Sequence, residues 1–219
     1  MISNQELLDA IVLREGGHRT RGDGMCLMEA VAFFAGEKHS DRPDCTSPAL
    51  AEYARRLNDR LKNDRERARL KVLIPILVGT NQPEAEAERR RVIVLGTARE
   101  IVPLAFEFAK VPGEHTSNLR ALKDDASFEE IRRVCREARA AAAAYAYADA
   151  AYADAADAAA DAAAYTATGA ADTAAYAADA AADAADAADT ASTPRRGRVI
   201  DAAIGVLQKA SEIKLSEAT

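Results

Sequence analysis

Apolar residues recur every three or four positions along most of the chain, which is the spacing of one helix face. Ser3 or Asn4 can cap a first helix, and Ser47 followed by Pro48 is typical of another helix start. The compact apolar run 72–78 contains Pro75, which argues against a central strand. We therefore predict an all-α fold with a multi-helix globular body. The apolar faces of the two capped helices are Leu7, Leu8, Ile11 and Val12, and Leu50, Tyr53, Leu57 and Leu61.

The second half of the body continues this helical pattern. Residues 84–110 have the periodicity of one long helix, in which Pro103 should force a kink or a break. Ser127 with Glu130 three residues later forms a capping box, which predicts a helix start. Residues 199–213 are amphipathic, and we expect them to form a C-terminal helix that docks on the body.

The segment 138–193 differs from the rest of the chain, because 34 of its 56 residues are Ala and none is Leu, Ile, Val or Phe. Alanine has the highest helix propensity, so we expect a helical arm there. Gly169 is its only helix-breaking residue and favours a fold-back into a hairpin. The sequence thus predicts a body at 1–125, an Ala/Asp-rich helical arm at 126–193 and a docking helix at 194–219.

Charge is distributed unevenly. The whole chain carries −6, whereas residues 140–193 hold nine Asp and no Lys, Arg or Glu, which leaves +3 for the remaining residues. On a helix most of these carboxylates share one face. That face has two interpretations: a solubilising surface on a low-complexity hairpin, or a surface that engages a basic partner. The candidate binding residues are Asp157, Asp161, Asp172, Asp179 and Asp183.

Composition restricts the function classes. No apolar run approaches the roughly 18 residues of a membrane span, and the N-terminus lacks the pattern of a signal peptide, so we expect a cytoplasmic protein. The three cysteines are then expected to be free thiols. The negative net charge argues against general nucleic-acid binding. Basic residues between 55 and 71 alternate with acidic ones, which is typical of a salt-bridged, solvated face.

A dense motif lies near the N-terminus. It runs from Gly24 to Ala30 as Gly-Met-Cys-x-Met-Glu-Ala, and continues in Ala35-Gly36-Glu37, Ser40-Asp41, Pro43, Cys45, Ser47-Pro48 and Asn58-Asp59. With these residues the chain resembles a family of uncharacterised proteins of actinobacteria and their phages. The resemblance covers about residues 10 to 80. It implies an origin, and it implies no activity.

Cys26 is the candidate nucleophile of this motif. It is expected at a helix N-terminus, where the helix dipole lowers the pKa of a thiol. The stretch 23–27 is also similar to the nucleophile motif of ovarian-tumour-type cysteine proteases, although Met25 replaces an Asn of that motif. The candidate imidazole partners are His18 and His115. The alternative is a small thiol buried in the core.

Metal binding is a second candidate chemistry for the same region. The candidate ligands are His18, Cys26, His39 and Cys45. Their spacings of 8, 13 and 6 residues lack the close cysteine pair of common zinc sites. We therefore expect neither a metal nor another cofactor.

Together these patterns predict a non-enzymatic interaction protein, encoded by a phage, whose acidic helical face engages a host or self partner. The expected partner is a protein, such as a basic host protein, with self-association through the Ala-rich arm as another form of contact. Membrane and nucleic-acid partners are not expected. The alternatives are a Cys26-dependent, hydrolase-like thiol enzyme and a small structural metal-binding domain.

Overall fold

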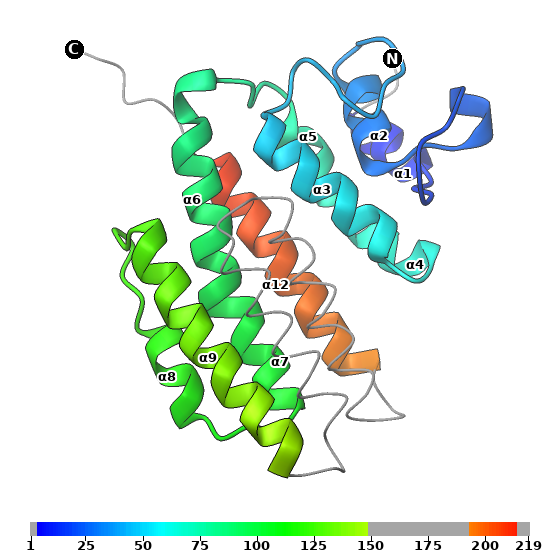
Figure 1. Cartoon of the computed structure of the whole chain (residues 1–219). Coiled ribbons are helices and arrows are strands. Elements are labelled where there is room, and N and C mark those ends of the chain that lie inside the picture. The colour runs from blue at the N-terminus through cyan, green and yellow to red at the C-terminus, as the bar shows by residue number, and fades with distance from the viewer. Residues whose placement is uncertain (1–3, 149–192, 214–219) are drawn as a thin grey trace. The chain divides into compact units, whose positions relative to one another are not determined.

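The computed structural model of the chain describes residues 4–148 and 193–213 (Figure 1). These residues are largely helical, and they contain no β-strand beyond an isolated parallel bridge between Leu13 and Met25. The all-α prediction is thus confirmed. The chain forms two compact units, one of Met1–Arg89 with Ser211–Thr219 and one of Arg90–Ala210.

The first unit has α2 at its centre, packed against α3 and α5. Leu27 and Met28 of α2 are fully buried in this core. Its helices are α1 (Asn4–Ala10), α2 (Leu27–Phe34), α3 (Pro48–Arg60), α4 (Asp64–Ala68) and α5 (Ile74–Leu77), with 3-10 turns η1 (Arg21–Asp23), η2 (Arg69–Leu73) and η3 (Pro83–Ala85).

The predicted start of α3 is confirmed. The Ser47 hydroxyl accepts a hydrogen bond from Leu50 N at 3.3 Å, and Pro48 occupies the first turn, where its missing N–H costs nothing. The predicted apolar face of the first helix is wrong at Val12, which is 53% exposed. Since α1 ends at Ala10, the following residues are not helical and neighbouring side chains point to opposite sides. Val12 therefore faces outward between the buried Ile11 and Leu13.

The segment expected as one helix is α6 (Glu86–Gly96), a π-helical turn η4 (Thr97–Ile101) and α7 (Val102–Phe108). Pro103, which was expected to cause a kink or a break, lies in the first turn of α7, and the structure changes helix type before it instead of breaking. Proline cannot donate the backbone hydrogen bond of a helix, and its ring crowds the preceding turn. The wider π turn directly before α7 accommodates it without ending the helical path.

The second unit brings α12 (Thr193–Ser211), the last helix in sequence, alongside the α6–α7 segment (Figure 1). Arg198 pairs with Glu107 and Lys209 with Glu100, so the two segments run antiparallel. The unit is completed by α8 (Glu114–Arg120), which packs on α7 and α9 (Phe128–Ala148).

The predicted cap of α9 is confirmed, since Glu130 N donates to the Ser127 hydroxyl at 3.2 Å. The first alanines of the Ala-rich segment belong to this helix, and Ala138 and Ala142 are buried. The proposed turn at Gly169 and the five candidate Asp residues lie outside the described residues, so the arm and the domain limits stay predictions. In the part of the chain that the structure describes, no helix has the length and apolarity to cross a membrane.

Candidate functional site

The motif residues near the N-terminus assemble around one loop, residues 14–26, which folds back beside α2. Arg14 N donates to Met25 O at 2.8 Å and closes the loop. The backbone of Gly24 has a φ of +127°, a value that residues other than glycine rarely adopt. A Cβ at Gly24 would also lie 2.9 Å from Cγ of Arg14 and 3.0 Å from Nε2 of His18. The glycine of the motif is thus required by the loop itself.

Glu29 lies under this loop and holds it with its carboxylate, although its side chain is only 2% exposed. Oε1 accepts from the backbone N of His18 at 2.6 Å. Oε2 accepts from Nδ1 of His18 and from the backbone N of Cys26, both at 2.8 Å. Burial raises the pKa of the Glu29 carboxyl, but the hydrogen bonds from His18 and Cys26 outweigh it, so the pKa lies below its ordinary value. Glu29 is therefore ionised and internally satisfied.

Cys26 is the N-cap of α2, and its sulfur accepts a hydrogen bond from Glu29 N at 3.5 Å. Its side chain is buried, at 1% exposure. Burial raises the pKa of the Cys26 thiol to about 12, and the nearby Glu29 charge adds to the effect, although backbone hydrogen bonds oppose it. The pKa is thus shifted in the direction opposite to that expected for a nucleophile at a helix N-terminus.

His39 completes what we call the Glu29 cluster, made of His18, Cys26, Glu29 and His39. Nε2 of His39 donates to the carbonyl of His18 at 2.9 Å and lies 3.5 Å from Oε1 of Glu29. Nδ1 of His39 is buried without a hydrogen-bond partner among the described residues. Both imidazoles thus serve to fix the loop, and neither one hydrogen-bonds the Cys26 sulfur in the described contacts.

A second layer of polar side chains anchors the loop from α3. Asn58, fully buried, accepts from Leu27 N at 3.2 Å and donates to the carbonyl of Arg14 at 2.8 Å. Asp59 accepts from Gly16 N at 2.9 Å. These motif residues therefore hold the loop to the first unit and satisfy its buried backbone groups.

The remaining sequence candidates lie apart from this cluster. Cys45 is half-buried before α3, and its carbonyl accepts from Asn81 N at 3.1 Å. His115 belongs to the other unit, where it lies 3.7 Å from its neighbour Glu114 in α8. Of the four proposed metal ligands, the structure brings His18, Cys26 and His39 together around Glu29. Nowhere in residues 4–148 or 193–213 do three or more His, Cys, Asp or Glu side chains form a group suited to a metal ion.

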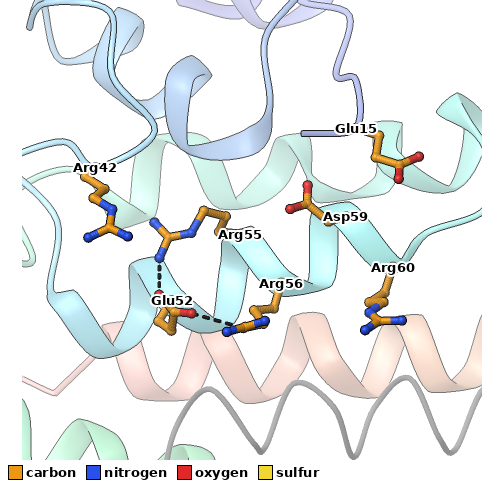
Figure 2. Close-up of a pocket in the computed structure, with 7 residues that line it drawn as sticks. All are labelled: Glu15, Arg42, Glu52, Arg55, Arg56, Asp59 and Arg60. Atoms are coloured by element: carbon orange, nitrogen blue, oxygen red, sulfur yellow. Dashed lines mark hydrogen bonds and ion pairs between the residues drawn. The ribbon is translucent and has the colours of Figure 1, made fainter. Parts of the chain in front are cut away.

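A different site lies on the exposed side of α3, a hollow of about 480 Å³ that we call the arginine groove (Figure 2). Figure 2 shows Arg42 beside Arg55 at one end of the groove and Arg60 near Asp59 toward the other. Glu52 receives hydrogen bonds from Arg55 and, at 3.0 Å, from Nε of Arg56. The arginine groove is lined by Glu15, Arg42, Glu52, Arg55, Arg56, Asp59 and Arg60.

Part of this site is predictable from the sequence. The alternation of charges predicted a salt-bridged face, and the Glu52 pairs with Arg55 and Arg56 confirm it. The contribution of Arg42 does not follow from helical spacing, because Arg42 lies in the loop before α3. Only the folded loop places Arg42 beside Arg55, whose guanidinium donates to the carbonyl of Asp41 at 3.1 Å.

Comparison of the chain with protein-family models, curated proteins and solved structures found no match. The chemistry of the Glu29 cluster and of the arginine groove is therefore interpreted from the residues themselves.

Proposed function

We propose that this is a non-enzymatic interaction protein, in which the motif region is a scaffold and charged surfaces engage protein partners. The observation that carries the proposal is the state of Cys26. A thiol nucleophile must be a thiolate with access to its substrate. Cys26 is buried, and a pKa of about 12 keeps it protonated at neutral pH.

The hydrogen-bond pattern around Glu29 supports the same interpretation. A general base needs a free lone pair directed at a substrate proton. The Glu29 carboxylate instead accepts three internal hydrogen bonds, two of them from backbone N–H groups. The thiol-enzyme alternative would require the loop to open and Cys26 to contact an imidazole.

The partner surface in this proposal is the acidic face formed by Asp157, Asp161, Asp172, Asp179 and Asp183, which lies outside the described residues. With nine Asp and no cation in 140–193, this segment complements a basic protein. The resemblance to uncharacterised proteins of actinobacteria and their phages is compatible with a phage origin, in which case the partner is a protein of the bacterial host or a second copy of the chain.

The test is a pull-down from an actinobacterial lysate with three forms of the full chain. These are the unaltered protein, a variant in which the five Asp residues are replaced by Asn, and Cys26→Ser. We expect the Asn variant to lose a captured protein, Cys26→Ser to retain it, and high salt to release it from the unaltered chain. Circular dichroism of each form serves as the folding control.

The opposite pattern would reject the proposal. If Cys26→Ser abolishes capture of the protein while the fold is retained, and the Asn variant captures it as the unaltered chain does, a thiol enzyme is the better interpretation. Light scattering on the same three forms separates self-association from capture of a host protein.

A further inference from the structure

Three arginines form an exposed stripe along α9. Arg132, Arg136 and Arg139 are separated by four and then three residues, so they share one side of the helix. All three are exposed, whereas the side that carries Ile131 and Ala138 is buried in the second unit. In the described part of the chain, Arg136 and Arg139 make no hydrogen bond or ion pair. Their guanidinium groups are therefore available to a partner.

The carboxylates of α9 do not neutralise this stripe. Glu129 and Glu130 lie in the first turn, where they complement the positive end of the helix dipole. After them, Glu137 is the one carboxylate of the helix, and it forms an ion pair at 2.8 Å with Arg133, to one side of the stripe. Residues 131–148 contain four arginines and one glutamate, which leaves this part of α9 a net charge of +3.

The same helical spacing continues in the sequence beyond the described end of α9, into the predicted Ala/Asp-rich arm. On a continuous helix the positions concerned fall within an arc of about 80°. The stripe then consists of three arginines, three uncharged residues and three aspartates. In order, its positions are Arg132, Arg136, Arg139, Ala143, Tyr147, Ala150, Asp154, Asp157 and Asp161.

Such a stripe is complementary to itself when two copies lie antiparallel. The arginines are separated by four and then three residues, and the aspartates by three and then four, so reversing one copy brings every aspartate opposite an arginine. Two-fold symmetry makes each contact occur twice, and the small Ala143 and Ala150 near the middle allow a close approach of the two helices. The expected pairs are Arg132 with Asp161, Arg136 with Asp157 and Arg139 with Asp154.

One chain cannot make these contacts within itself. The pairing would require the chain to reverse direction at residues 146–147, midway between the paired positions, yet α9 continues as a helix to Ala148. We propose that this stripe is the interface of an antiparallel homodimer, in which the aspartates of each copy dock on the arginines of the other. The inference rests on the proposed function, because a second copy of the chain is one of the two partners considered there.

The test is light scattering of the full chain over a range of concentrations, with two charge-reversal variants. One variant combines Arg136→Glu with Arg139→Glu, and the other combines Asp154→Arg with Asp157→Arg. Each variant alone should raise the dissociation constant of the dimer by at least about tenfold, because like charges would then face each other. An equal mixture of the two should form dimers again, since every Glu then faces an Arg. High salt should weaken the dimer of the unaltered chain.

The matched control combines Arg19→Glu with Lys38→Glu. Both residues are exposed in the first unit, and their replacement changes the net charge as much as the double arginine variant does. The control should dimerise as the unaltered chain does, and circular dichroism should show the same helix content in every form.

Three results would overturn the inference: a monomer at all concentrations, equal weakening by the control, or a mixture of the two variants that stays monomeric. Recovery of dimers in the mixture also shows that both variants are folded. The lysate pull-down reports on capture of a host protein, whereas light scattering of the purified chain reports on self-association. Failure of the homodimer is therefore distinguishable from failure of the proposed function.

Discussion

Nδ1 of His18 donates a hydrogen bond to Oε2 of Glu29 at 2.8 Å, and this contact joins the tip of the motif loop to the first turn of α2. The carboxylate can only accept, so Nδ1 carries the proton. The same Glu29 side chain also holds the backbone N of His18 and of Cys26. One buried carboxylate thus determines the course of the loop at residues 14–26, which leads into the motif at Gly24.

Replacing Glu29 by Gln should destabilise the first unit. The amide offers one oxygen where the carboxylate offers two, and its NH₂ group would face the N–H donors. We expect a loss of about 1–3 kcal/mol in the free energy of unfolding, measured by urea denaturation. Glu129→Gln, at an exposed position in α9, is the control and should change stability by a few tenths of a kcal/mol. Equal stability of the two variants would contradict the role assigned to Glu29.

The same residue predicts a pH dependence. The pKa of Glu29 is lower in the folded chain than its ordinary value of 4.5. A lowered carboxyl pKa contributes stability that is fully present above the unfolded-state pKa and is lost as pH falls through the folded-state pKa. Stability should therefore decline below about pH 4.5, and Glu29→Gln should show a shallower decline than the unaltered chain. Parallel acid denaturation curves for the two forms would reject this assignment.

The three cysteines should differ in reactivity toward iodoacetamide in the native protein. Burial raises the pKa of both Cys26 and Cys135 to about 12, and both are buried. Burial also raises the pKa of Cys45, but this residue is half-exposed and accessible to the reagent. We expect alkylation of Cys45 first, with Cys26 and Cys135 modified only after unfolding, as measured by mass spectrometry of peptides. Rapid and selective modification of Cys26 at neutral pH would instead indicate an activated nucleophile.

Local signals predicted the fold well, because helix caps depend on neighbouring residues. Ser47 with Pro48 and Ser127 with Glu130 determine helix starts whatever surrounds them. The role of Glu29 was harder to predict. A Glu three residues after an N-cap indicates a capping box, yet cysteine is an uncommon cap, and the His18 contact comes from a residue 11 positions away.

The arginine groove could be predicted only in part, because some of its lining depends on long-range placement. Helical spacing brings Arg55 and Arg56 to Glu52. It says nothing of Arg42, which precedes α3, or of Glu15, whose partner Arg67 is 52 positions away. Such contacts depend on how the loops pack in the folded chain. Residues that meet in this way show no regular spacing in the sequence.

The ion pair between Arg198 and Glu107 should contribute little, in contrast to Glu29. Two hydrogen bonds of 2.6 and 3.1 Å join these side chains, but both are about half exposed to water. The pairing with Arg198 is the main reason that the pKa of Glu107 is lowered. We expect Glu107→Gln to cost less than about 1 kcal/mol, and the cost to shrink at high salt. Thermal unfolding at two salt concentrations measures it, and a cost that persists at high salt would contradict a solvent-screened pair.

Two glycines in the second unit provide a matched pair of substitutions. Alanine is intrinsically favoured over glycine in a helix by about 0.5–1 kcal/mol. Gly205, within α12, has nothing within 4 Å of an added Cβ, so Gly205→Ala should stabilise the protein by that amount. At Gly96 of α6, an added Cβ would lie 2.8 Å from Cγ2 of Val206 and 3.3 Å from its Cγ1.

Val206 cannot yield cheaply, because it is β-branched and only 1% exposed. Gly96→Ala should therefore destabilise the protein by about 1–3 kcal/mol, the usual cost of overpacking, despite the better helix propensity. Adding Val206→Ala removes the clashing methyl groups, so the double variant should be more stable than the sum of the two single changes predicts. Urea denaturation of the four variants measures the coupling. If Gly96→Ala is as stable as Gly205→Ala, or if the two changes simply add, α6 and α12 do not approach as closely at Gly96 as the structure indicates.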